Sequence, residues 1–116
     1  MRIEMTARGV GLTAATRGHV ERRLYFALGR FADRVSQVHV RLADVNGPKG
    51  GVDKSCRIRV RLFGLPTVVV EQMDSDLNAA IDRSADRIGR AVARKLDRAL
   101  TSMRDRRTGE PTREEP

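Results

Sequence analysis

The stretch that decides the fold is residues 76–103, DLNAAIDRSADRIGRAVARKLDRALTSM. Apolar residues recur in it every three or four positions, which is the repeat of one face of an α-helix with about 3.6 residues per turn. These residues are Ile81, Ala85, Ile88, Val92, Leu96 and Ala99. The pattern predicts an amphipathic helix whose apolar side packs against the rest of the domain.

Arginines occupy the opposite side of the same helical wheel, and we call them the arginine stripe: Arg83, Arg87, Arg90, Arg94 and Arg98. Burial of the apolar side would turn all five guanidinium groups to solvent. A run of charge is often only a solvated surface. Five arginines in one narrow sector nevertheless favour contact with nucleic acid, because guanidinium presents a planar fork to phosphate oxygens and stays charged.

The composition is that of one small basic domain. A chain of 116 residues can bury a core without disulfides or metals. Aromatic residues make up only 3%, which suits aliphatic helices on a sheet. The 23 Lys and Arg exceed the 15 Asp and Glu, for a formal charge of +8, and such an excess points to a polyanionic partner.

No segment directs the chain to a membrane or out of the cell. The longest purely apolar run is Val68 to Val70, and the N-terminal sequence has no signal-peptide core. Cys56 is the single cysteine and cannot form an internal disulfide. We therefore expect a cytoplasmic protein without a membrane partner.

Before the last helix the chain predicts a strand, a helix and three further strands, over residues 2–7, 13–32, 35–45, 54–62 and 67–73. The resulting fold is α+β, in the order β-α-β-β-β-α, with residues 1–103 as one domain. A parallel crossover followed by an antiparallel meander would place both helices on one face of a four-stranded sheet. Residues 104–116 lose periodicity, and we expect a disordered charged tail.

The strand at residues 54–62 has the clearest alternation. Its inward residues are Cys56, Ile58, Val60 and Leu62, and its outward residues are Arg57, Arg59 and Arg61. The uncovered face of the sheet should therefore also be basic.

The first helix has a second polar sector, formed by His19, Arg23, Phe26, Arg30 and Arg34. Phe26 between arginines could stack on an unpaired base or an exposed sugar. It could equally pack at the edge of the core, with the arginines only solvating the helix. The residues alone leave both interpretations open.

Residues 46–51 form the clearest turn cluster, with Lys49 inside it and Lys54 just after it. A plain hairpin connection explains this cluster, and a basic loop that contacts a partner is the alternative.

The sequence offers little for catalysis. His19 and His39 are expected on the solvent sides of different elements, and neither a nucleophile motif nor a metal-binding histidine pair is present. Asp82 and Asp86 lie one helical turn apart, but ion pairs with the neighbouring arginines explain them better than a cation does. We expect no enzyme, cofactor, metal or small-molecule substrate.

Three segments together resemble a known family. They are IEMTARGVGLT at residues 3–13, VERRL at 20–24 with Phe31 after it, and DLNAAIDRSADRIGRAVARK at 76–95. They resemble the ribosome hibernation promoting factors, also called ribosome-associated inhibitors or sigma-modulation proteins. The strongest part of the resemblance is the opening of the last helix. The positions that match the family pattern there, just before the regularly spaced basic residues, are Asp76, Ala79, Ala80, Ile81 and Asp82. The resemblance covers about residues 2–100.

The resemblance implies a domain like the double-stranded-RNA-binding fold. It also implies binding to the small ribosomal subunit and its ribosomal RNA, in the channel used by messenger and transfer RNA, which blocks translation in starved or stationary cells. The implied RNA-binding residues are Arg83, Arg87, Arg90, Arg94, Lys95, Arg98, Arg23 and Arg30. The chain is similar to the short members of the family, which implies that it does not pair ribosomes unaided.

Three positions depart from the family pattern and put local contacts in question. Asn78 stands where Tyr is usual, Gly9 where Asn is common, and Gly89 is expected to interrupt the helix. Two other functions remain as alternatives. One is a general structured-RNA-binding module acting off the ribosome, and the other is a small-ligand enzyme or protein-interaction domain that uses the sheet.

Overall fold

The structure, a computed structural model, describes the backbone of residues 1–45 and 52–114 and the side chains of these residues as far as Met103. Its elements are β1 (Ile3–Arg8), α1 (Ala14–Leu28), the 3₁₀ turn η1 (Gly29–Phe31), β2 (Val35–Asp44), β3 (Lys54–Leu62), β4 (Val68–Asp74) and α2 (Leu77–Glu114). The predicted order of elements is confirmed. The turn cluster at 46–51, with Lys49, lies outside the described residues.

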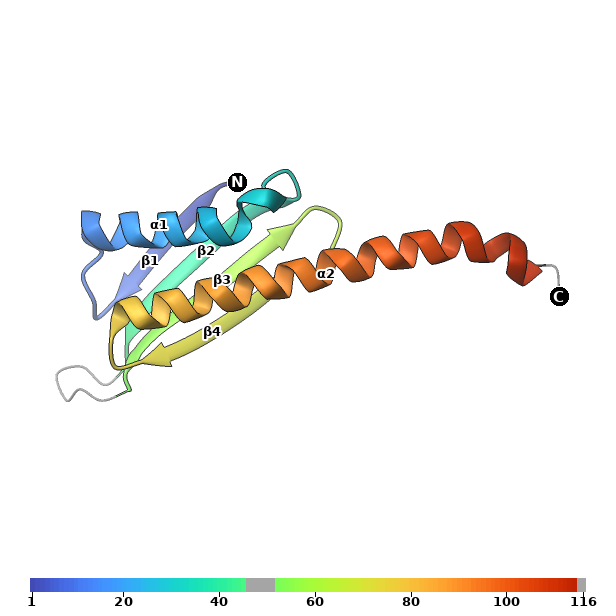
Figure 1. Cartoon of the computed structure of the whole chain (residues 1–116). Helices are drawn as coiled ribbons and strands as arrows, with labels where there is room; N and C mark the ends of the chain where they lie inside the picture. The colour runs from blue at the N-terminus through green and yellow to red at the C-terminus, as the bar shows by residue number, and fades with distance from the viewer. Residues whose placement is uncertain (46–51, 115–116) are drawn as a thin grey trace.

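The four strands form one sheet in the order β1-β2-β3-β4. β1 runs parallel to β2, and the β2–β3 and β3–β4 pairs are antiparallel. Since parallel neighbours need a crossover, α1 crosses over one face of the sheet, and α2 lies on the same face (Figure 1). The α+β fold and its topology are as predicted.

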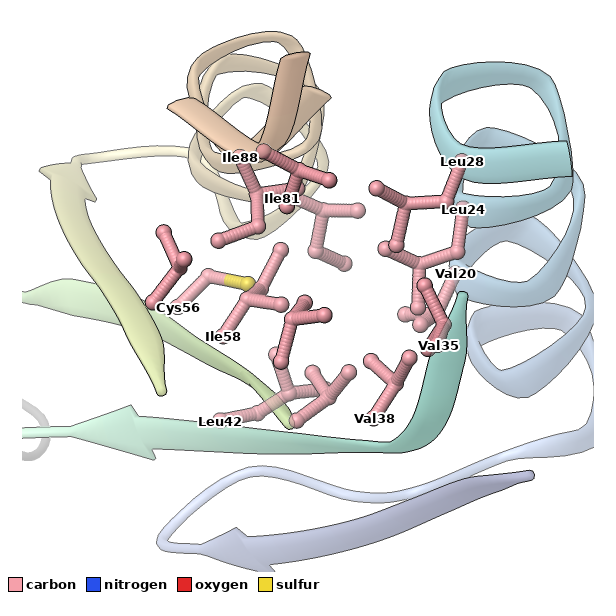
Figure 2. Close-up of a cluster of buried hydrophobic side chains, with 14 of the residues drawn as sticks. Val20, Leu24, Leu28, Val35, Val38, Leu42, Cys56, Ile58, Ile81 and Ile88 are labelled. Carbon is pink, nitrogen blue, oxygen red and sulfur yellow. The ribbon is translucent and has the colours of Figure 1, made fainter. Parts of the chain in front are cut away.

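The core lies between this face and the two helices (Figure 2). α1 contributes Val20, Leu24 and Leu28, and α2 contributes an aliphatic row. The row consists of Ile81, Ala85, Ile88 and Val92, all at most 1% exposed. On β3 the predicted inward residues are all buried, and the three arginines between them are exposed. The period of two along this strand thus separates core from solvent as the sequence predicts.

A bulge in β2 was not predicted. The register between β2 and β3 shifts between Val35 and Gln37, so that Val35 and Val38 are both buried although three positions separate them. An extra residue in one strand produces this change of side. Both valines can therefore face the helices.

Caps confirm where the helices begin. Thr13 accepts a hydrogen bond from the Thr16 N–H at 3.1 Å. Asp76 accepts one from the Ala79 N–H at 2.9 Å. Side-chain acceptors of this kind satisfy backbone donors that the first helical turn leaves without partners. Gly9 has a φ of 78°, a conformation that glycine and, less easily, asparagine adopt, which accounts for this departure from the family pattern.

Two helix ends and one interruption differ from expectation. α1 ends at Leu28 and passes into η1, whereas we expected one helix to about Ala32. α2 continues through Gly89 and beyond Met103 to Glu114. The expected interruption at Gly89 is therefore wrong. Disorder of the charged tail over residues 104–116 stays a prediction, and the structure describes the backbone of this segment as far as Glu114.

Candidate nucleic-acid interface

The structure places the arginine stripe on the side of α2 that faces away from the sheet. All five arginines are exposed, and Lys95 beside them is half-buried. Among the side chains described to residue 103, no ion pair involves Arg87, Arg90, Arg94 or Arg98. These four guanidinium groups are available to an anionic partner.

Arg83, the first residue of the stripe, has a partner within the protein. Its guanidinium lies 3.2 Å from Asp74 Oδ2, at the end of β4. The backbone N–H of Asp76 and, after it, the Arg83 guanidinium lower the pKa of the Asp74 carboxyl. Arg83 therefore contributes to the junction between β4 and α2, unlike the remainder of the stripe.

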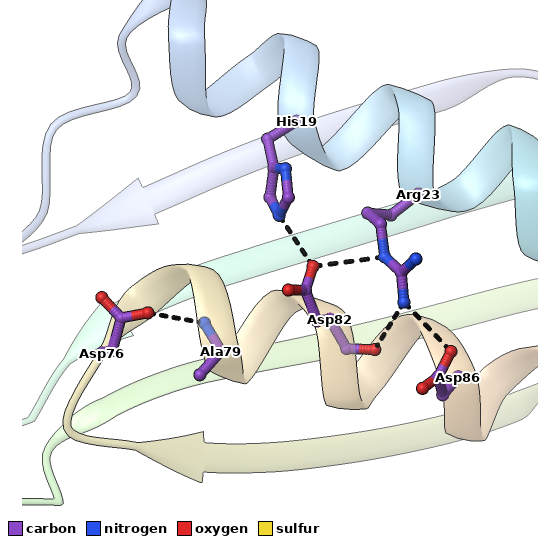
Figure 3. Close-up of polar contacts among 6 residues, drawn as sticks. All are labelled: His19, Arg23, Asp76, Ala79, Asp82 and Asp86. Carbon is purple, nitrogen blue, oxygen red and sulfur yellow. Dashed lines mark hydrogen bonds and ion pairs between the residues drawn. The ribbon is translucent and has the colours of Figure 1, made fainter.

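A polar bridge joins α1 to α2 (Figure 3). His19 Nε2 lies 2.7 Å from Asp82 Oδ1, and Arg23 Nε lies 3.2 Å from the same oxygen. Nη2 of the same guanidinium group donates a hydrogen bond to Asp86 Oδ1 at 3.1 Å. We call these four residues the interhelical bridge. It ties together two helices whose bridging residues are more than 55 positions apart in the sequence.

The interhelical bridge corrects two expectations. Asp82 and Asp86 find their partners on α1, whereas we expected them to pair with arginines of their own helix. His19 was expected on a solvent side, but its side chain is only 25% exposed and is bonded to α2. RNA binding by Arg23 stays a prediction; its guanidinium pairs with both carboxylates, and its side chain is 29% exposed.

Beside the bridge, a groove of about 600 Å³ runs between the two helices. It is lined by Phe26, Ala27 and Arg30 of α1 and η1, and by Asp86, Gly89, Arg90, Ala93 and Arg94 of α2. A Cβ built on Gly89 would lie 3.2 Å from both Cβ and the carbonyl oxygen of Ala27. Small residues thus let the helices approach and form the groove floor. In the sequence, Gly89 stands out only as a departure from the family pattern. Its contact with Ala27 depends on how the two helices pack and is seen only in the structure.

Phe26 stands at this groove and is 82% exposed. The interpretation that it packs at the edge of the core is therefore wrong. The neighbouring Arg30 guanidinium lies over the ring of Phe31, 4.6 Å from its centroid, an arrangement that orients the arginine beside the groove. The structure brings Phe26, Arg30, Arg90 and Arg94 together, while Arg83 and Arg98 lie elsewhere along α2.

Lys54 does not stand free at the hairpin. Its ammonium group lies 3.0 Å from Asp53 Oδ1 and 3.2 Å from Asp44 Oδ2. The hydrogen bond with Asp53 is the main reason that the pKa of Lys54 is raised. Asp53 and Asp44 thus neutralise Lys54, which a basic loop that contacts a partner would need as a free charge.

No reactive centre emerges from the described residues. Burial raises the pKa of the Cys56 thiol to about 11, so the nucleophilic thiolate is scarce at neutral pH. Within residues 1–45 and 52–103, no three His, Cys, Asp or Glu side chains gather as metal ligands would. The described helices include none that is long and apolar enough to span a membrane.

Two solved structures resemble this fold. The N-terminal domain of Protein Y from Thermus thermophilus is 35% identical, with a TM-score of 0.68, and the match covers 81% of this chain and 98% of that one. A ribosomal subunit interface protein from Coxiella burnetii is 22% identical, with a TM-score of 0.66, and shares the fold over 81% of this chain and 96% of its own. A search of curated proteins found no match.

The sequence model of one family matches residues 3–107, which is nearly all of the regular structure. That family is described as "Sigma 54 modulation protein / S30EA ribosomal protein". The match agrees with the resemblance seen in the sequence, which covers about residues 2–100. This chain belongs to the Sigma 54 modulation protein / S30EA ribosomal protein family.

Proposed function

We propose that this protein binds the small ribosomal subunit in the channel used by messenger and transfer RNA, and thereby blocks translation in starved or stationary cells. The family is one of ribosome-associated proteins, which supports a ribosome as the partner. The protein acts in the cytoplasm as a binding factor and carries out no reaction. It does not pair ribosomes unaided.

The observation that carries this proposal is the exposed set of guanidinium groups around the interhelical groove. Arg90 and Arg94 from α2 and Arg30 from η1 line one groove, and Arg87 and Arg98 extend the same surface along α2. Arginines bind phosphate oxygens through paired hydrogen bonds. Such a surface recognises the backbone and shape of folded RNA more than its base sequence.

Residues of the interhelical bridge have a supporting part in this interface. His19 and Arg23 hold the two helices in one relative position through Asp82 and Asp86. The arginines of the two helices therefore form a single preorganised surface, and less conformational entropy is lost when RNA binds.

Phe26 adds a second kind of contact. Its exposed ring lies among arginines at the groove, where an unpaired ribosomal RNA base can stack on it while the arginines bind the adjacent phosphates. Stacking of one base on an aromatic side chain contributes roughly 1–3 kcal/mol to nucleic-acid binding.

Binding of purified small subunits by a charge-reversed variant tests the interface. Arg87→Glu/Arg90→Glu/Arg94→Glu should abolish co-sedimentation while the far-ultraviolet circular dichroism stays unchanged. The matched control is Arg17→Glu/Arg22→Glu/Arg34→Glu, which makes the same charge change at three exposed residues outside the groove. Undiminished binding by the first variant, or equal loss by both, would contradict the proposed interface.

Competition with an unrelated RNA duplex tests the ribosome as the target. The wild-type protein should bind small subunits at least tenfold more tightly than the duplex. Equal affinity for the two would favour a general structured-RNA-binding module acting off the ribosome.

A further inference from the structure

The open face of the sheet carries a second group of basic side chains, on the side opposite the helices. Because side chains alternate along a strand, residues between the buried positions of β2 and β3 all point to this face. We call the five basic ones the sheet patch: His39, Arg41, Arg57, Arg59 and Arg61. The four arginines are exposed and His39 is half-buried.

The pairing of β2 with β3 places these basic side chains next to one another. Arg41 is directly opposite Arg57, and His39 is directly opposite Arg59. Opposed residues of antiparallel strands have Cβ atoms about 4.5–5.5 Å apart, and like charges at that distance destabilise a sheet. Two residues along one strand advance about 6.6–6.8 Å, so Arg57, Arg59 and Arg61 form a regular row.

Among the described side chains, no ion pair includes Arg41, Arg57, Arg59 or Arg61. Two acids border the patch, since Glu71 is directly opposite Arg57 and Glu4 is directly opposite His39. Glu4 pairs with Arg2 at 3.6 Å, and Glu71 accepts a hydrogen bond from Ser55 at 2.9 Å. Arg23, Arg83 and Lys54, by contrast, all have carboxylate partners.

The patch is also shaped to receive a ligand. A hollow of about 130 Å³ lies among His39, Arg41, Arg57 and Arg59. A second hollow, of about 200 Å³, lies beside it and is lined by Arg59 and Arg61 together with Glu4, Gln37 and His39. Several guanidinium groups therefore converge on each small depression, and oxygens of one anion could accept from more than one of them.

We propose that the sheet patch is a second RNA-binding surface, which takes the phosphate backbone of an RNA segment separate from the one bound at the helices. The described strand residues on this face include no Phe, Tyr or Trp, so the face offers mainly phosphate contacts. One copy of the protein would thus hold two RNA segments, one on each side of the domain. This surface needs RNA but not the ribosome, so it does not rest on the proposed channel site.

Salt dependence of binding tests the patch. The sheet variant Arg41→Gln/Arg57→Gln/Arg59→Gln and the helix variant Arg87→Gln/Arg90→Gln/Arg94→Gln each remove three positive charges. Each phosphate contact contributes roughly 0.7–0.9 to the slope of log affinity against log salt concentration. The slope for small subunits should fall by about 2–3 in the sheet variant while its circular dichroism stays unchanged. An unchanged slope and affinity would overturn the proposal.

Co-capture tests whether one copy holds two RNA segments. Monomeric protein, at a concentration below that of RNA, is mixed with a biotinylated RNA duplex and a fluorescent duplex of the same sequence. The wild-type protein should retain fluorescence on streptavidin, and both the sheet variant and the helix variant should lose it. Retention by the sheet variant at the wild-type level would overturn the proposal.

Two further outcomes distinguish RNA binding by the sheet patch from RNA binding by the helices alone and from binding to a membrane surface. Loss of RNA binding in the sheet variant with none in the helix variant would support the patch and contradict the helix interface. Phosphatidylserine vesicles serve as a probe of a different anionic surface. Vesicle binding that the sheet variant loses, together with unchanged RNA binding, would assign the patch to a membrane surface and overturn the proposal.

Discussion

Gly89 of α2 lies directly against Ala27 of α1, so that a Cβ at Gly89 would come within 3.2 Å of both the Cβ and the carbonyl oxygen of Ala27. Contact between the two helices at this point determines the width of the groove that contains Phe26 and Arg90. Gly89 therefore affects both the packing of the fold and the shape of the proposed RNA-binding groove.

Gly89→Leu should destabilise the protein by about 1–3 kcal/mol, because overpacking forces neighbouring groups to move. The backbone of Ala27 is one of the groups that must yield. The matched control is Gly29→Leu, where nothing lies within 4 Å of the added Cβ and no overpacking is expected. Urea unfolding measures both. A Gly89→Leu protein as stable as the wild type would contradict the close approach.

Arg23→Gln should weaken the fold more than it weakens RNA binding. Its partners Asp82 and Asp86 are partly exposed, so the loss in free energy of unfolding should be about 0.5–1 kcal/mol. Arg90→Gln should show the opposite balance, with little change in stability and a clear loss of small-subunit affinity. A double-mutant cycle of Arg23 with Asp82 should give a favourable coupling smaller than the whole Arg23 effect, because Arg23 also pairs with Asp86. Zero coupling would contradict the bridge.

Phe26→Trp should report directly on base stacking. The natural chain has no tryptophan, so the new indole would be the single one. RNA binding should quench its fluorescence, because a base stacks on the ring. Tyr25→Trp is the control, since Tyr25 is 55% exposed on α1 and does not line the groove. Equal quenching at both positions, or none at residue 26, would argue against stacking at Phe26.

Asp74 should make the stability of the β4–α2 junction depend on acid pH. Its pKa is lower in the folded protein than in the unfolded chain, so its contribution is present above the unfolded value of about 4 and is lost as pH falls through the folded value. The urea midpoint of Asp74→Ala should therefore lie below that of the wild type at pH 7, and the difference should shrink below pH 4. A difference that is constant with pH would contradict this prediction.

Arg41→Thr should raise the stability of the protein while it lowers RNA affinity. The substitution removes a like charge opposite Arg57, leaves the uncharged Thr6 on the other side, and places a β-branched residue in a central strand, for a gain of about 0.2–1 kcal/mol. The gain should be larger at low salt, where repulsion is less screened. Thermal unfolding at two salt concentrations checks this, and a loss of stability at low salt would contradict the repulsion.

The sequence predicts best what depends on local periodicity. Alternation in β3 identifies Cys56, Ile58, Val60 and Leu62 as core residues, because a period of two leaves no other face for them. The repeat in α2 likewise separates Ile88 from Arg90. Thr13 marks the start of α1 because a hydroxyl there can satisfy a free backbone N–H.

What the sequence does not predict depends on contacts between distant residues. His19 and Asp82 are 63 positions apart, and neither residue type reveals the other as its partner. Phe26 is exposed because of the position at which α1 and α2 come into contact, at Gly89. A helical wheel of either helix alone does not show this contact. The bulge near Ser36 depends in the same way on how β2 pairs with β3.

Competition with messenger RNA and transfer RNA shows whether the protein occupies their channel on the small subunit. Purified small subunits are incubated with labelled messenger RNA and transfer RNA, and retention of both is measured as the protein is added. The wild-type protein should displace both, and prebound RNAs should reduce its own binding, while Arg87→Glu/Arg90→Glu/Arg94→Glu should displace neither. Simultaneous binding of the protein and both RNAs, each at undiminished affinity, would contradict the channel as its site.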